Sequence, residues 1–444
     1  MSPTSSSAPQ QRKATIASWV GTTVEYYDYA CYGLAASVVF ADIFFPSSDP
    51  LVGTLLSLSS FAVGYIARPL GALVFGHFGD RIGRKRILVL TLTMMGLSTF
   101  LIGVLPDHGQ IGSLAPVLLV IARILQGVSA GGEYGGAVLL TTEHAVRGRR
   151  GLLGSLVNTG TTAGLLLANL VFLPVFAMDD SAMKEWGWRV PFLLSAVLVV
   201  IGLFVRLAVE ESPEFDEVKQ HSAVRRLPVA DLFRTSWRTV LLVALGIISA
   251  GTAFTMASVY SLTYGKETLG LSNDRMLAVL LPGTVVVMAC VPLFGWLSDR
   301  IGVRPVFLGG AASLVVLPFA WFALLDTRQY GLMLLGMALL LAGYAANYAV
   351  VPVYFAGVFP AAIRFSGMSI AFTTGLIASN AIAPAVATSL QAATGGWLTT
   401  AFYMAGASLV SIVAGLLLRM PEEPAVVPAA SGGAAAPVAL PQDT

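Results

Sequence analysis

Charged residues are scarce in this sequence. Of its 444 residues, 11% are Asp, Glu, Lys or Arg and 56% are hydrophobic. Water-soluble domains carry about 25% charged residues, so the composition excludes an ordinary soluble protein. Cysteine is scarcer still, since Cys31 and Cys290 stand far apart, each in an apolar stretch. That spacing excludes a disulfide framework and a cysteine-rich metal site.

The motifs of enzymes and ATP-driven pumps are also missing. The sequence has no phosphate-binding loop of the form G-x-x-x-x-G-K-[ST] and no nucleophile beside a placed base. The first 13 residues are polar and lack the apolar core of a removable signal peptide. We therefore expect a protein that is not an enzyme, holds no metal or organic cofactor and has no nucleic-acid partner.

Long apolar segments are abundant. A membrane-spanning helix takes about 20 residues, and the longest hydrophilic gap separates six candidate segments from six others. We predict an all-α integral membrane protein with twelve transmembrane helices in two six-helix halves. The segments are 16–45, 52–77, 87–105, 114–143, 151–177, 187–208, 239–264, 275–297, 306–325, 330–358, 365–391 and 397–419.

The predicted organisation has five parts. A disordered N-terminus (1–15) precedes the first half (16–208), and a linker (209–238) leads to the second half (239–419). The remaining residues, 420–444, are rich in Pro, Ala and Gly, so we expect a disordered tail.

Lys and Arg residues are divided unevenly between the two sides of the predicted membrane. Eighteen lie on the side of the two termini and the linker, and five lie on the other side. Lys and Arg are enriched in cytoplasmic loops. We therefore predict that the termini and the linker are cytoplasmic.

One basic loop occurs twice. GHFGDRIGRKR at residues 76–86 shares the pattern G-x-x-x-D-R-I-G with GWLSDRIGVRP, which stands 219 residues further on. A repeat at about half the chain length indicates two related halves. We predict that both copies form a cytoplasmic gate. Its residues are Asp80, Arg81 and Arg84 in the first copy and Asp299 and Arg300 in the second.

These motifs resemble those of the major facilitator superfamily. The loop fits that superfamily's G-x-x-x-D-R-x-G-R-[KR] signature, and RILQGVSAGGE at 123–133 fits its R-x-x-Q-G pattern. GTTVEYYDYACYG at 21–33 resembles the metabolite:proton symporter family, and within it the chain is most similar to shikimate-type permeases. The resemblance is weaker in the second half. It implies two halves around a central cavity, which the first, fourth, seventh and tenth helices line.

Three charged residues lie near the predicted centre of the bilayer. At 1.5 Å per residue, Glu25 and Asp28 lie about 14–18 Å deep, and Arg123 lies about 14 Å deep from the other side. A charge there costs about 2.5–3.5 kcal/mol and usually faces a partner or a cavity. We hypothesise that Asp28, with Glu25, binds the coupling proton, while Arg123 alternates between these acids and an anionic substrate.

A static ion-pair network that joins the first and fourth helices is the alternative. It is less favoured, because hydrophobic replacements of a buried ion pair are often as stable. Tyr29 and Tyr32 share the helix face of the two acids, and we place them in the substrate site with Gln126. Glu133 has a depth similar to that of Arg68, so we expect these two to pair, in a structural or a proton-coupling role.

The second half has no obvious charge at mid-membrane. Its polar residues predict a neutral wall that binds substrate through Tyr260, Asn347 and Tyr348. The alternative for Tyr260 is an aromatic residue at the membrane interface.

Together these features predict a proton-coupled symporter that imports a small organic acid by alternating access. It would act as a monomer in a bacterial inner membrane, with its substrate, protons and lipid as partners. A single central arginine suits a shikimate-like acid or another carboxylate. The alternatives are a symporter for a zwitterion such as proline or betaine, a proton-coupled exporter, and a nutrient sensor that does not transport. The fifth segment lacks the Gly-Pro motif usual in exporters, and the short tails disfavour a sensor.

Overall fold

A computed structural model describes residues 8–46, 50–146, 148–220 and 225–420, and all regular structure in these ranges is helical. The expected tail, apart from residue 420, lies outside the described residues, as do residues 1–7. The first helix, α1, begins at Ala8, so residues 8–15 are helical where the sequence predicted disorder. Gln, Arg and Lys in this stretch are good helix formers.

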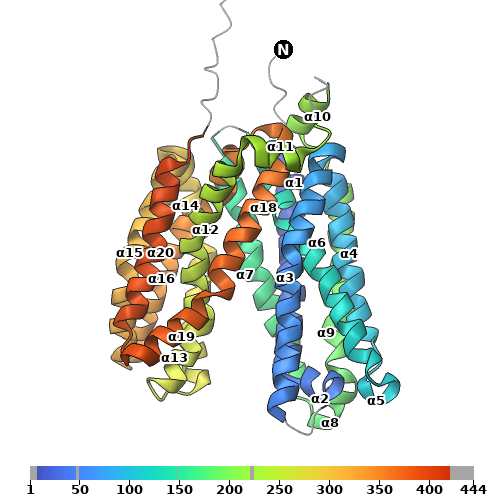
Figure 1. Cartoon of the computed structure of the whole chain (residues 1–444), viewed down its shortest axis with the longest axis vertical. Helices are drawn as coiled ribbons and strands as arrows, with labels where there is room; N and C mark the ends of the chain where they lie inside the picture. The colour runs from blue at the N-terminus through green and yellow to red at the C-terminus, as the bar shows by residue number, and fades with distance from the viewer. Residues whose placement is uncertain (1–7, 47–49, 147, 221–224, 421–444) are drawn as a thin grey trace, which may run out of the picture.

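The first half contains six long helices. They are α1 (Ala8–Val38), α3 (Pro50–Ile82), α4 (Arg84–Val104), α6 (Leu114–His144), α7 (Arg150–Phe176) and α9 (Arg189–Leu207). The short helices α2 (Phe40–Phe44), α5 (His108–Ile111) and α8 (Asp180–Ala182) lie at one end of this bundle (Figure 1).

The second half has the same number of crossings, but three of them are interrupted. The first is α12 (Trp237–Thr255), which continues through a π turn into α13 (Ser261–Glu267). Next come α14 (Asn273–Ile301) and α15 (Val303–Asp326), and then α16 (Tyr330–Ala349), which leads into α17 (Val351–Gly357). The last two crossings are α18 (Arg364–Leu376), joined by a π turn to α19 (Ala383–Thr394), and α20 (Leu398–Leu417).

Among the described residues, eleven helical stretches are long and apolar enough to cross a membrane. The exception among the long helices is α1, whose 31 residues are sufficient in length but include Arg12, Lys13, Glu25 and Asp28. With α1 as the twelfth crossing, the predicted all-helical membrane architecture is confirmed. The buried acids Glu25 and Asp28 are among the residues that make α1 less apolar than a usual spanning helix.

Close packing of α3 against α6 brings their polar residues together. A side chain at Gly71 of α3 would collide with the main chain of Val128, and one at Gly131 of α6 would collide with the Arg68 carbonyl. Small residues on both helices allow their backbones to approach this closely. Arg68 and Arg123 are therefore held on adjacent helices.

The start of α1 and the end of α20 lie at one end of the molecule, which we call the terminal face (Figure 1). The other end is the opposite face. Two short helices of the linker, α10 (Pro213–Gln220) and α11 (Pro228–Thr235), cover part of the terminal face. Near this face α3 packs against α18, and α14 packs against α7, so the two halves are in contact there.

Candidate transport site

A cavity of about 320 Å³ lies between the two halves. The first half supplies its wall from α1, α3 and α7, and the second half supplies it from α12, α16 and the segment that joins α18 to α19. Most of the wall is aromatic or aliphatic, and among the described residues that line it Arg68 has the one charged side chain. The polar and aromatic members are Tyr26, Tyr29, Phe61, Tyr65, Arg68, Thr161, Asn169, Phe254, Tyr344, Tyr348 and Asn380.

Arg68 joins the cavity to a buried acid. Its Nη2 donates to Glu25 Oε1 at 3.1 Å, and its Nε donates to the Tyr29 hydroxyl at 2.9 Å. The guanidinium also lies over the rings of Tyr29 and Tyr65, 4.1 and 5.1 Å from their centroids. The second carboxylate oxygen of Glu25 is buried without a hydrogen-bond partner. Glu25 therefore depends on Arg68 for its stabilisation, and Arg68 faces the cavity.

Arg123 is enclosed by aromatic rings. Its guanidinium lies 4.3, 4.2 and 4.8 Å from the ring centroids of Tyr29, Tyr32 and Phe61. It donates to Gln126 Oε1 at 3.1 Å and to the Phe61 carbonyl at 3.3 Å, and it is fully buried. Cation–π contacts of this kind can stabilise a desolvated arginine. Arg123 therefore lies behind the cavity wall. The sequence predicted Arg123 as the arginine that faces the substrate, but the structure places Arg68 in that position.

Asp28 is bound by hydroxyl groups. Its two carboxylate oxygens accept from Thr99 and Ser195, each at 2.7 Å. Gln126 Nε2 donates to the Thr99 hydroxyl at 2.6 Å, so Asp28 and Arg123 are linked through Thr99 and Gln126. The structure thus places the predicted acid and arginine in one network without bringing them into direct contact.

Glu133 pairs with Arg206, for which the sequence predicted no partner. Its carboxylate forms a buried ion pair with Arg206 of α9 and accepts from Thr91 at 2.9 Å. The expected pair between Arg68 and Glu133 is therefore wrong. Arg206 reaches Glu133 because Gly21 of α1 leaves room, since a Cβ there would collide with both members of the pair.

Of the three residues predicted to form the substrate wall of the second half, one lines the cavity. Tyr348 lines the cavity together with Tyr344, and their rings are stacked 5.2 Å apart. Asn347 instead faces away and donates to the Phe307 carbonyl at 3.0 Å within the same half. Tyr260 packs against Tyr264 and Phe322, outside the lining.

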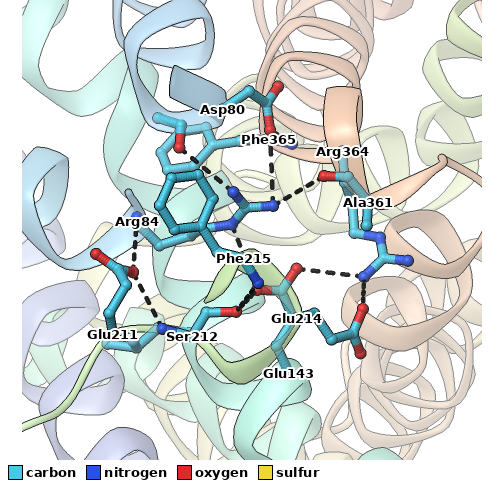
Figure 2. Close-up of polar contacts among 12 residues, drawn as sticks. Asp80, Arg84, Glu143, Glu211, Ser212, Glu214, Phe215, Ala361, Arg364 and Phe365 are labelled. Carbon is cyan, nitrogen blue, oxygen red and sulfur yellow. Dashed lines mark hydrogen bonds and ion pairs between the residues drawn. The ribbon is translucent and has the colours of Figure 1, made fainter. Parts of the chain in front are cut away.

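The two copies of the basic loop make equivalent contacts across the halves. Asp80 accepts from the backbone N–H groups of Phe365 and Ser366 at 3.0 and 2.9 Å, in the first turn of α18 (Figure 2). Asp299 accepts from those of Gly151 and Leu152 at 2.7 and 2.9 Å, in the first turn of α7. A carboxylate at a helix N-terminus binds free N–H groups and interacts favourably with the helix dipole. We call these two contacts the latch.

Only the first copy adds an arginine to the latch. Arg84 lies 3.7 Å from Asp80 and 3.3 Å from Glu143, and it donates to the Ala361 carbonyl of the other half at 3.0 Å (Figure 2). Glu143 also pairs with Arg364, which in turn contacts Glu214 of the linker. By contrast, Arg81 and Arg300 are exposed, and Arg300 lies over the Trp296 ring.

Several residues of these networks were not found from the sequence. Tyr65, Thr99, Ser195 and Arg206 all stand in apolar segments, where polarity is itself the signal of a functional or paired residue. Glu143 ends the fourth predicted segment and gave the same signal. No three His, Cys, Asp or Glu residues in the described ranges are grouped as metal ligands would be.

The chain belongs to the Major Facilitator Superfamily, whose sequence profile matches residues 18–335 and 283–441. The proteins of this class that it resembles are membrane transporters, so the resemblance seen in the sequence is confirmed. A solved structure of the proton:xylose symporter XylE is similar over 93% of this chain and 94% of that chain, with a TM-score of 0.69. At 19% identity, that likeness shows the shared fold.

Individual relatives are considerably closer in sequence. The Escherichia coli inner membrane metabolite transport protein YhjE is 37% identical, covering 91% of this chain and 93% of that protein. The Escherichia coli shikimate transporter is 36% identical, over 93% of this chain and 95% of that protein. The proline/betaine transporter of the same organism is 31% identical, over 92% and 83%.

Proposed function

We propose that this protein is a proton-coupled symporter that imports a small organic acid by alternating access. The observation that carries the proposal is the placement of Arg68. Within the described part of the chain it is the one charged side chain of the cavity lining, and its ion-pair partner is the buried carboxylate of Glu25. An anion that binds Arg68 in the cavity therefore competes with Glu25 for the same guanidinium.

This competition couples the anion to a proton. When the substrate carboxylate takes over Arg68, Glu25 loses its counter-charge in a low-dielectric site, and the charged form becomes unfavourable. A proton from water then joins the Glu25 carboxylate, which becomes neutral. Release of the substrate frees Arg68, and Glu25 gives up its proton as the ion pair forms again. The site thus carries one proton with each monoanion, and both arrive from the same side.

The lining favours a small, hydroxylated acid. Aromatic rings from both halves, those of Tyr29, Tyr65, Phe254 and Tyr344, offer faces for a ring or an alkyl body. Asn169, Asn380 and Thr161 offer hydrogen bonds to hydroxyl groups. A shikimate-like carboxylate fits this chemistry, and two relatives of similar identity are a shikimate transporter and a metabolite transport protein.

A zwitterionic substrate is the second candidate. The aromatic faces that suit a ring would also hold a quaternary or secondary ammonium group. The relative named a proline/betaine transporter covers nearly the whole chain. In this case Arg68 binds the carboxylate in the same way, and only the other end of the substrate differs.

Uptake into proteoliposomes tests the proposal. Purified protein is reconstituted, about two pH units are imposed with the acid side outside, and labelled shikimate, benzoate, proline and betaine are compared. At one proton per monoanion, two pH units drive accumulation up to about 100-fold, because each unit is worth about 1.4 kcal/mol. A proton ionophore abolishes this accumulation. Uptake of every substrate that ignores the gradient would refute symport.

Glu25→Gln separates coupling from binding. Gln cannot take up a proton but keeps the size of the side chain, so we expect accumulation to be lost while substrate exchange across the membrane continues. Glu217→Gln is the matched control, because Glu217 is an exposed carboxylate on α10 of the terminal face. Gradient-driven accumulation by Glu25→Gln that equals that of the control would assign the proton to another group, and Asp28→Asn is then the next variant.

A further inference from the structure

Asn158 of α7 joins the two halves through its side-chain amide. It is 1% exposed, and its Nδ2 donates to the main-chain carbonyl of Tyr348 in α16 at 2.8 Å. Its Oδ1 accepts from the Tyr134 hydroxyl at 2.9 Å. Because a carbonyl can only accept, the amide nitrogen has to face Tyr348, and this fixes the orientation of the amide.

The Tyr348 carbonyl is available because of a proline. In a continuous helix it would accept from the N–H four residues on, but that residue is Pro352, which has no N–H. The helix is interrupted at this point, since α16 ends at Ala349 and α17 begins at Val351. The Val350 N–H at the helix end is the remaining main-chain donor toward this carbonyl. Asn158 therefore supplies, from the other half, the donor that Pro352 lacks.

This contact lies between the cavity and the latch. Along α7, Gly151 binds Asp299 at the terminal face, and Thr161, Leu165 and Asn169 line the cavity. Asn158 is seven residues beyond Gly151, which corresponds to about 10 Å of helix. Since the side chain of Tyr348 lines the cavity, the bond from Asn158 holds a cavity residue from its terminal side.

A second contact between the halves accompanies it. The Tyr134 ring stacks on Phe372 of α18, with centroids 3.9 Å apart and an angle of 14° between the planes. The hydroxyl of this same tyrosine donates to Asn158. Tyr134, Asn158, Tyr348 and Phe372 thus form one layer of contacts between the halves beside the cavity.

We propose that Asn158, with the carbonyl that Pro352 leaves available, is an inner gate that closes the cavity toward the terminal face. The gate is separate from the latch and lies directly beside the substrate-lining residues. It rests on the alternating-access part of the proposed function. For the cavity to open toward the terminal face, the bond from Asn158 to Tyr348 has to break.

Two variants weaken the gate by different chemistry. Asn158→Ala removes the donor, whereas Pro352→Ala supplies a main-chain N–H that competes with Asn158 for the same carbonyl. Each is expected to shift the ratio of terminal-face-open to terminal-face-closed molecules by roughly threefold to tenfold, the value of one neutral hydrogen bond. Because both act on one carbonyl, the double variant should shift the ratio no further than the larger single variant does.

The ratio is measured without any substrate, so the result does not depend on which compound is transported. Spin labels are placed at two exposed positions of the terminal face, Ile82→Cys and Ile301→Cys, after Cys31 and Cys290 are replaced by alanine. Double electron–electron resonance on the folded fraction then gives the distribution of distances between the halves. The expected result is a larger long-distance population in both single variants.

Asn347→Ala is the matched control, because it also removes a buried amide that donates to a backbone carbonyl, but within one half. It should lower thermal stability and leave the distance distribution unchanged. Tyr134→Phe, which keeps the stacked ring, should shift the distances in the same direction by a smaller factor. The proposal is overturned by unchanged distances in both gate variants, by additive shifts in the double variant, or by an equal shift in Asn347→Ala.

Discussion

At the scale of single residues, four buried charges inside the first half are held in four different ways. Arg206 has a carboxylate, Arg123 has aromatic faces, and Asp28 has two hydroxyl groups. Arg68 is shared between Glu25 and the cavity. In a closed pair such as Glu133–Arg206, each charge is neutralised by the other and neither faces the cavity. A charge that is held by neutral groups, or that lies at the cavity wall, can change partner. We therefore expect a closed pair to be structural and a charge of the second kind to take part in transport.

Glu133 tests that distinction. Glu133→Gln leaves Arg206 charged and buried without a counter-charge, so we expect it to destabilise the protein by about 3–5 kcal/mol. Replacing both residues, as Glu133→Gln with Arg206→Met, should cost less than either single change. Thermal unfolding of the purified protein in detergent measures all three variants.

The same variants decide between the two roles for Glu133. A double variant that still accumulates substrate against a pH gradient assigns Glu133 to structure, and one that folds but loses accumulation assigns it to proton coupling. If the costs of the two single changes simply add in the double variant, the ion pair is not what stabilises this region.

The sequence allowed depth in the membrane to be predicted, but not direction around a helix. A rise of 1.5 Å per residue placed Arg68 and Glu133 at similar depths. Depth alone does not show which helices are neighbours on which side, so the expected pair of Arg68 with Glu133 is wrong. Arg206 contacts Glu133 through the space left by Gly21, and Arg68 turns toward α1 instead. Both facts depend on how the helices pack around each other.

At the scale of helices, each contact of the latch joins a carboxylate of one half to the N-terminus of a helix in the other half. Asp80 at the end of α3 binds the N-terminus of α18, and Asp299 at the end of α14 binds that of α7. The positive φ of Gly83, 113°, ends α3 sharply and lets α4 begin at Arg84. The repeated loop could be predicted as a gate because its pattern recurs, but its partners carry no motif, since they are backbone N–H groups.

Removing either carboxylate should weaken closure of the terminal face. Loss of a helix cap costs about 0.5–2 kcal/mol, which corresponds to a shift of about 2- to 30-fold in the ratio of open to closed molecules. Asp80→Ala should have the larger effect, because Asp80 also contacts Arg84, whereas Val303 stands at the matching position of the second copy. The distances between labels at residues 82 and 301 give both ratios.

Measuring the transport rate and the substrate Kd separately distinguishes a residue of the latch from a residue of the substrate site. Asp80→Ala should lower the rate of transport while the Kd for substrate changes little, because the cavity lining is intact. Glu217→Gln, on the exposed surface of α10, again serves as the control. Lost binding with an unchanged rate would contradict the assignment of Asp80 to the latch.

The interruptions in three helices of the second half were not predicted. Hydropathy treats 330–358 as one segment, and it is indeed one crossing, but Pro352 divides it into α16 and α17. Likewise, π turns at Met256–Tyr260 and Ile377–Ala381 interrupt the crossings that begin with α12 and α18. One of these turns places Asn380 in the cavity wall. Apolar length predicts that a helix crosses, but local hydrogen bonding decides where it breaks.

At the scale of the whole molecule, the halves are joined at the terminal face by the latch and, closer to the cavity, by Asn158 and Tyr134. Among the described residues, no hydrogen bond or ion pair joins the halves near the opposite face. Two layers of polar contacts between the halves therefore lie between the cavity and the terminal face. If the terminal face is cytoplasmic, as the distribution of Lys and Arg predicts, this arrangement is the one that would receive substrate from outside the cell.

That orientation is the last prediction. The described part of the linker and the two basic loops lie at the terminal face, and the linker and these loops hold 11 of the 18 Lys and Arg residues assigned to the cytoplasmic side, so this face should be cytoplasmic. Single cysteines in a background without Cys31 and Cys290 report it, at Ile82 on the terminal face and at Val52 on the opposite face, both exposed. A maleimide that does not cross membranes should label Val52→Cys in intact cells and Ile82→Cys only after the cells are permeabilised. The cysteine-free parent should remain unlabelled, and labelling in the reverse order would invert the topology and make the same arrangement open toward the cytoplasm.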